Sequence, residues 1–212
     1  MLNVGSLVMA TALLSLLWEL RGRRVFAQEV LAAAGVAADV RAAGLRAVNA
    51  EYLRVAKWSD LFRDTTSIDL LVSWSATWRS SNEALWKAWI GRSGVMLRVL
   101  LPDPDDPSVV AELAKRFDMS NVDVISKIRE AAAFYSALQG DAGTASTVTV
   151  AYSPFAPVWA YYGFGGTRIV TVYPATPGRT PDVPAMVFTA DGSVGAFLGS
   201  QFERAWARGR TV

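Results

Sequence analysis

The chain opens on an uninterrupted apolar run, MLNVGSLVMATALLSLLW, which carries no formal charge before Glu19 and is followed by the basic cluster RGRR at residues 21–24. At a rise of about 1.5 Å per residue, a helix over residues 1–18 spans roughly 27 Å, close to the thickness of a hydrocarbon core. The pattern predicts a hydrophobic helix over residues 1–24 that can serve as a membrane anchor.

Two environments satisfy this helix. As a membrane span, it would hold the rest of the chain at the inner face of the cytoplasmic membrane, because basic residues that follow a span stay in the cytoplasm. As a buried or self-associating helix, it would expose only the thin polar stripe of Thr11, Ser15 and Glu19, which recur every four residues. In that second case the protein is cytoplasmic and soluble.

Residues 25–57 are expected to form a helical connector. The segments RRVFAQEVLAAAG and VAADVRAAG predict two short helices, which Gly35 and Gly44 can terminate. The segment LRAVNAEYLR that follows is compatible with either a strand or a helix.

From Trp58 onward, strand patterns and helix patterns alternate. The continuous apolar runs SIDLLVSW and VMLRVLLP predict buried, adjacent, parallel strands joined by a helix that contains Trp86. Two helices follow, then four strand patterns, and the chain closes on the amphipathic segment VGAFLGSQFERAWARG. Residues 58–212 are therefore expected to form one α/β domain, a mixed sheet flanked by helices.

Composition excludes several kinds of chemistry. The chain has 0 His and 0 Cys, which removes imidazole bases, thiolate nucleophiles, Cys-based metal sites and disulfides. The formal net charge is +2, from 21 Lys+Arg against 19 Asp+Glu, so charge alone does not require a nucleic-acid partner.

One acidic loop could carry metal chemistry. In VLLPDPDDPS an apolar strand leads into Asp103, Asp105 and Asp106. Asp103 and Asp105 could hold Mg²⁺ in a phosphohydrolase, in which one carboxylate attacks phosphorus. The alternative is a strand-exit loop whose carboxylates cap the helix that begins near Ser108.

A second loop could bind an anion. In SWSATWRSSNE a buried strand gives way to Thr77, Arg79, Ser80 and Ser81 before a helix. Hydroxyls and one Arg at the carboxyl end of a parallel strand can hold a phosphate. The alternative is that Ser81 or Asn82 caps the helix while Arg79 lies in solvent.

The order of elements supplies a third lead. The strand LRVLLPDP, a helix pair, the stretch VTVAYSPFAPVWAYYGFGGTRIVTVYP and the terminal FERAWARG together resemble a single phospholipase D-like domain between about Trp58 and Arg208. That family carries His-x-Lys-x-x-x-x-Asp on a late strand, with His as nucleophile, Lys on the phosphate and Asp as support. Here Val158, Ala160 and Gly165 occupy the His, Lys and Asp positions. The resemblance therefore implies the fold without catalytic residues, metal or cofactor.

The resemblance further implies a non-catalytic module whose crevice, lined by Thr77, Arg79, Asp103 and Arg168, binds a phosphate-containing ligand (nucleotide or nucleic acid) or a protein partner. Strand alternation places one of Tyr161 and Tyr162 toward this crevice and the other in the core. Because the family pairs two halves around one site, the resemblance implies a homodimer. With the N-terminal helix, such a module would be a membrane-attached bacterial sensor or effector. The alternatives are the Mg²⁺-dependent phosphohydrolase and a structural, membrane-associated assembly subunit without a ligand.

Overall fold

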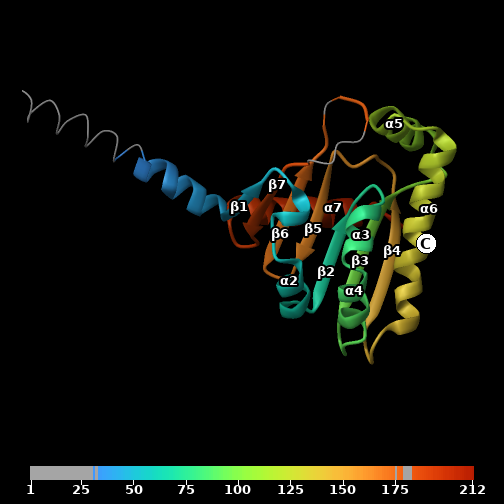
Figure 1. Cartoon of the computed structure of the whole chain (residues 1–212), viewed down its shortest axis with the longest axis horizontal. Coiled ribbons are helices and arrows are strands. Elements are labelled where there is room, and N and C mark those ends of the chain that lie inside the picture. The colour runs from blue at the N-terminus through green and yellow to red at the C-terminus, as the bar shows by residue number, and fades with distance from the viewer. Residues whose placement is uncertain (1–30, 32, 175, 179–182) are drawn as a thin grey trace, which may run out of the picture. The chain divides into compact units, whose positions relative to one another are not determined.

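The computed structural model describes residues 31, 33–174, 176–178 and 183–212 (Figure 1). The chain divides into two units, Met1–Ala42 and Ala43–Val212. Residues 33–43 are helical through Gly35, so the predicted helix end at Gly35 is wrong. A glycine inside a helix costs only about 1 kcal/mol relative to alanine, which the neighbouring alanines offset. The predicted end at Gly44 is confirmed: the helix stops there, and Gly44 adopts a left-handed φ of 78°.

Within the described residues, eight strands form one mixed sheet in the order β1-β7-β6-β5-β2-β3-β4-β8. The strands are β1 (Leu45–Asn49), β2 (Ser67–Leu71), β3 (Met96–Pro102), β4 (Thr147–Ser153), β5 (Trp159–Phe164), β6 (Thr167–Val172), β7 (Ala185–Thr189) and β8 (Arg210–Thr211). The mixed α/β architecture predicted from the sequence is confirmed.

The two apolar runs form the centre of this sheet. Strands β2 and β3 are adjacent and parallel, with Ile68 opposite Leu97, and β4 continues the parallel set on the other side of β3. The chain between β2 and β3 forms α3 (Ala76–Ser81) and α4 (Glu83–Ile90), and α4 carries Trp86. This arrangement confirms the predicted parallel pairing. The prediction was possible because strands that are buried on both faces have continuous apolar sequences.

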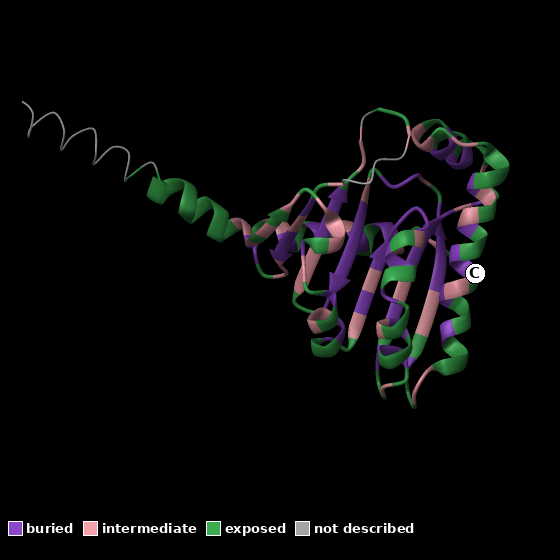
Figure 2. Cartoon of the chain, in the orientation of Figure 1, coloured by how far each residue is buried: buried purple, intermediate pink, exposed green. Residues whose placement is uncertain are grey.

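Helices cover both faces of the sheet (Figures 1 and 2). One face packs against α2 (Trp58–Asp64), α3, α4, α5 (Pro107–Phe117) and α6 (Asn121–Ala137), and the other packs against α7 (Ser193–Trp206). The short 3-10 helices are η1 (Tyr52–Arg54) and η2 (Leu138–Asp141). The first core is rich in aromatic rings, with Trp78, Trp86 and Trp89 fully buried around Phe62.

The structure differs from the expected helical connector at residues 45–49. This segment is β1, an edge strand that pairs with β7 in antiparallel orientation. Its side chains alternate, with Arg46 and Val48 exposed and Leu45 half-buried, which is the two-residue period of a strand.

The described residues contain no helix that is both long and apolar enough to cross a membrane. The predicted hydrophobic helix over residues 1–24 lies outside the described residues.

Candidate ligand-binding site

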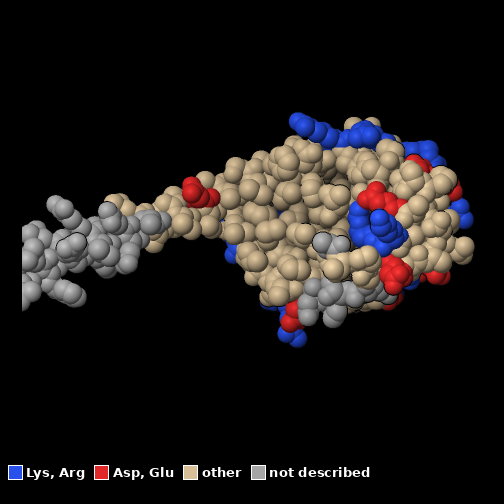
Figure 3. All heavy atoms as spheres, turned by 90° about the horizontal axis from the view of Figure 1, so that it is seen from above, with Lys and Arg blue, Asp and Glu red and all other residues tan. Residues whose placement is uncertain are grey.

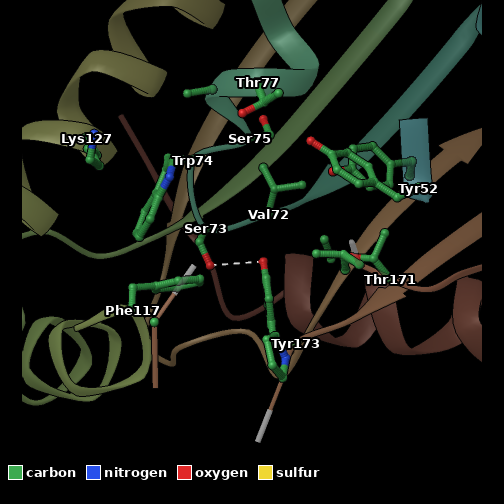
Figure 4. Close-up of a pocket in the computed structure, with 16 residues that line it drawn as sticks. Tyr52, Val72, Ser73, Trp74, Ser75, Thr77, Phe117, Lys127, Thr171 and Tyr173 are labelled. Carbon is green, nitrogen blue, oxygen red and sulfur yellow. Dashed lines mark hydrogen bonds between the residues drawn. The ribbon is translucent and has the colours of Figure 1, made fainter. Parts of the chain in front are cut away.

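A cavity of about 280 Å³ opens where β2 ends, on the face of the sheet that packs against α2 to α6 (Figure 4). Its lining comes from η1, the chain after β2, the ends of α5 and β6, the start of β5, and α6. The residues are Tyr52, Val72, Ser73, Trp74, Ser75, Ala76, Thr77, Phe117, Lys127, Ala160, Tyr162, Thr171, Tyr173, Pro174, Gly178 and Val183. The carboxyl ends of parallel strands are where α/β sheets bind ligands.

A sharp turn after β2 forms one side of the cavity. Ser75 adopts the left-handed conformation (φ 49°, ψ 33°), which is uncommon for a residue other than glycine, and α3 begins immediately after it. Two hydroxyl pairs hold the turn: Ser73 Oγ lies 3.1 Å from the Tyr173 hydroxyl, and Ser75 Oγ lies 2.9 Å from the Tyr135 hydroxyl. Strained backbone of this kind concentrates at functional sites.

The charge of the cavity comes from one side chain. Among the described lining residues, Lys127 of α6 is the one with a formal charge. Burial raises the pKa of Tyr52, and burial likewise raises the pKa of Tyr173. Both phenols therefore stay protonated at neutral pH and can donate hydrogen bonds. The cavity thus combines one cation with neutral donors, which suits a ligand that carries an anionic group.

Seen from above in Figure 3, this end of the molecule is hollowed, and the surface beside the hollow is mostly uncharged. Charged side chains lie beside the hollow and also along the upper and lower edges of this view.

The structure brings one predicted site residue, Thr77, to the cavity. Arg79 does not reach it: its Nε donates to the Trp74 carbonyl at 3.1 Å and its Nη2 to Glu130 at 3.0 Å, and its guanidinium lies over the Phe134 ring. Both interpretations of Arg79 from the sequence, as a ligand contact and as a solvated side chain, are therefore wrong. A buried guanidinium needs acceptors, and α6 with the Trp74 carbonyl supplies them.

The predicted helix, α4, begins at Glu83 with Asn82 at its N-cap position, as expected. An additional short helix, α3, precedes it from Ala76, so Ser80 and Ser81 lie exposed in the last turn of α3 and are absent from the cavity lining. Asn82 precedes α4 but makes no capping bond through its side chain, and its Nδ2 donates to the Trp78 carbonyl instead.

Two carboxylates of the acidic loop after β3 form ion pairs with arginine side chains. Arg210 donates to both carboxylate oxygens of Asp103, at 3.0 and 3.2 Å, and Arg129 pairs with Asp105 at 2.9 Å. Asp106 accepts hydrogen bonds from the Ser108 and Val109 amides, so it caps α5 as the alternative interpretation predicted. The described residues contain no group of three or more acidic side chains arranged to hold a metal ion.

Arg168 lies on the other face of the sheet. Along β6, Ile169 and Thr171 face the first core and the cavity, while Arg168 and Val170 face α7. The Arg168 guanidinium donates to the carbonyls of Gly165 and Thr167. The expected place of Arg168 in the crevice is therefore wrong, because side chains alternate between faces along a strand.

Strand β5 does border the cavity. Ala160 and Tyr162 line it, while Tyr161 stacks on Phe202 in the core beneath α7, with ring centroids 5.3 Å apart. The predicted division of the two tyrosines between crevice and core is confirmed. Val158 lies exposed just before β5, and Gly165 lies in the turn after it.

Most of the lining residues were not singled out in the sequence, among them Tyr52, Trp74, Phe117, Lys127 and Tyr173. They belong to segments that are far apart in the sequence. Trp74 and the serines beside it carry a signal, since they directly follow an apolar strand whose carboxyl end faces the crevice. The other four carry none, because their proximity depends on how the helices pack.

No protein-family model matches the sequence, and no curated protein matches it significantly. Among solved structures, the fold is similar to TrmBL2, an archaeal chromatin protein described as showing a novel mode of DNA binding, with 12% identity and a TM-score of 0.45 over 99% of this chain and 70% of that one. It is also similar to Nuc from Salmonella typhimurium, a phospholipase D family member, with 11% identity and a TM-score of 0.41 over 78% of this chain and 97% of that one. Similarity at this level does not assign the chain to either family.

Proposed function

We propose that Ala43–Val212 is a non-catalytic phospholipase D-like module that binds a small phosphate-containing ligand in the cavity beside β2. The observation that carries this proposal is Lys127, the one cation among the described lining residues, which otherwise present hydroxyls, aromatic rings and aliphatic groups. A lysine ammonium binds phosphate as a compact point charge, and the Tyr52, Thr77 and Thr171 hydroxyls lie in the same cavity.

The absence of catalysis is proposed from the groups that border the cavity. Ala160, at the position of the family's lysine, contributes only a methyl group there. Ser73 and Ser75 lie in the turn after β2, and each is hydrogen-bonded to a tyrosine hydroxyl whose pKa is raised by burial. A protonated phenol cannot accept a proton from serine, so neither serine has an activating base among these partners.

The geometry favours this function over the magnesium-dependent phosphohydrolase. Asp103 and Asp105 face Arg210 and Arg129, so their charge is compensated by protein cations. A metal ion would have to displace these arginines. Membrane attachment through residues 1–18, homodimerisation, and a role as a bacterial sensor, effector or assembly subunit remain proposals that this site neither requires nor opposes.

Calorimetric titration with adenosine 5′-monophosphate tests the proposal. We expect saturable binding that Lys127→Ala weakens by about tenfold or more, because a hydrogen bond between charged groups is worth about 1.5–3 kcal/mol. The matched control is Lys115→Ala, since Lys115 is exposed on α5 and does not line the cavity. Equal affinity in the wild type and Lys127→Ala would contradict the proposed site.

A further inference from the structure

The cavity has aromatic walls. Five of its lining residues are aromatic: Tyr52, Trp74, Phe117, Tyr162 and Tyr173. In Figure 4, Trp74 and Tyr52 lie on opposite sides of Val72, with Ser75 and Thr77 above and Tyr173 below. We call the space over Val72, between Trp74 and Tyr52, the aromatic slot. Its two sides are aromatic and its floor is aliphatic, and a planar apolar ring packs well against such groups.

Contacts around the slot hold its walls in place. Trp74 packs against Phe117 with ring centroids 4.6 Å apart, and Phe117 meets Tyr173 edge to face at 5.5 Å. The Trp74 carbonyl accepts a hydrogen bond from the buried Arg79, and the half-buried Tyr52 packs against the core on this face of the sheet. A slot whose walls are already ordered loses little conformational entropy when a ring enters it.

The charge of the cavity distinguishes between two classes of ligand that bind to aromatic side chains, cations and planar rings. Aromatic walls alone also suit a quaternary ammonium ion, which binds to ring faces. Lys127 opposes such a cation, and the described lining residues include no carboxylate to compensate it. A neutral ring joined to an anionic group satisfies both the slot and the lysine. Nucleobases have this character, since each presents a flat π-face that stacks on aromatic side chains.

We infer that the cavity binds a single nucleotide, with its base in the aromatic slot and its phosphate at Lys127. This inference rests on the proposed function and names the ligand class of the same site. A volume of about 280 Å³ lies near the lower limit of small-molecule pockets, which favours one nucleotide over a longer strand. Trp74 and Tyr52 are then the residues that determine specificity for the base, and Lys127 binds the phosphate.

Calorimetric titration of the full-length chain measures how much the base and the phosphate each contribute to affinity. The probes are adenosine 5′-monophosphate, ribose 5-phosphate, adenosine and a short single-stranded oligoadenylate. We expect the mononucleotide to bind about tenfold or more tightly than ribose 5-phosphate, the order of one stacked base. Tyr52→Leu should abolish this preference, because it removes one aromatic wall of the slot.

Trp74→Leu tests the wall of the slot that lies opposite Tyr52. If Trp74→Leu prevents folding, Tyr52→Leu still tests the slot, because Tyr52 is only half-buried. Trp159→Leu is the matched control, since Trp159 is a half-buried tryptophan that packs with the core beneath α7. It should leave every affinity unchanged.

The possible results distinguish failure of the nucleotide inference from failure of the proposed phosphate site. Equal affinity for ribose 5-phosphate and the mononucleotide overturns the aromatic slot and leaves the phosphate site standing. Adenosine that binds as well as the mononucleotide, with no effect of Lys127→Ala, overturns the phosphate site instead. Tighter binding of the oligoadenylate overturns the single-nucleotide ligand, and a lack of binding by all four probes overturns both proposals.

Discussion

Arg79 of α3 and Glu130 of α6 form an ion pair of unequal partners, 3.0 Å from Nη2 to Oε1, in which the arginine side chain is 6% exposed and the glutamate side chain 64% exposed. Arg79 also donates to the Trp74 carbonyl and lies over the Phe134 ring. The pair thus links α6, which carries Lys127, to the chain segment that carries Trp74. The residue predicted to touch a ligand instead supports those that line the cavity.

This asymmetry predicts unequal effects of the two truncations. Arg79→Ala should lower the free energy of unfolding by about 2–3 kcal/mol, because it leaves the Trp74 carbonyl without this donor and removes buried packing. Glu130→Ala should cost less than about 1 kcal/mol, since Glu130 is largely solvated and Arg79 keeps its other partners. Urea denaturation of both variants measures the difference. Equal losses would show that the ion pair itself dominates.

The turn between β5 and β6 offers a second matched pair. Gly165 has φ 52°, and a Cβ there would lie 2.9 Å from Thr65 Oγ1, whereas a Cβ on Gly166 would meet nothing within 4 Å. Gly165→Ala should therefore destabilise the fold by about 1–2 kcal/mol, the cost of a left-handed conformation for an L-residue. Gly166→Ala should change stability by less than about 0.5 kcal/mol. Thermal unfolding of the two variants tests this, and a Gly165→Ala protein as stable as Gly166→Ala would rule out the backbone requirement.

The sequence predicted the sheet better than the site. Strands β2 and β3 are recognisable because each is a continuous apolar run, a local property of the chain. Strand β1 was assigned to a helical connector because Leu45 and Ala47 alternate only weakly with their neighbours and follow an alanine-rich helix. Its identity as a strand depends on pairing with β7, which is more than a hundred residues away.

The site depends on orientation, which residue type alone does not reveal. Arg168 was expected in the crevice, yet the register of β6 against β5 turns it toward α7. Arg79 was expected at a helix start, yet the left-handed Ser75 starts α3 earlier and turns Arg79 into the protein. Thr77 does line the cavity, because it lies in the first turn of α3 beside the end of β2.

The cap of α5 should make stability depend on pH. Hydrogen bonds from the Ser108 side chain, and then from the Ser108 and Val109 amides, lower the pKa of Asp106 below its ordinary value of 3.8. The folded state therefore binds fewer protons at this group than the unfolded state. The stabilisation is present above about pH 3.8 and is lost as the pH falls through the folded-state pKa.

Asp106→Asn isolates this contribution, because asparagine caps a helix without a titrating charge. The wild type should be the more stable protein near neutral pH, and the difference should shrink as the pH falls below about 4. Denaturation at a series of pH values measures it. A difference that is constant or that grows toward acidic pH would exclude a lowered pKa at Asp106.

The protein should not hydrolyse a generic phosphodiester such as bis(4-nitrophenyl) phosphate. The proposed non-catalytic function implies this: the sequence has 0 His, and the resemblance to a phospholipase D-like domain places Val158, Ala160 and Gly165 at the positions of that family's catalytic motif. Release of nitrophenolate by purified protein is the measurement. Turnover that copurifies with the protein and survives both Asp103→Asn and Arg79→Ala would show that another group in the chain performs the chemistry.

Residues 1–18, rather than Ala43–Val212, should decide where the protein resides. They form a predominantly apolar segment without a charged side chain, whereas Ala43–Val212 has its own two cores on the faces of the sheet. If residues 1–18 span a membrane, the full-length protein should resist alkaline carbonate extraction, and the chain that starts at Ala43 should be soluble and monodisperse. If they pack against protein, their removal should expose apolar surface and cause aggregation. Full-length protein that is soluble without detergent would reject the membrane span, because water does not accommodate an exposed apolar helix of this length.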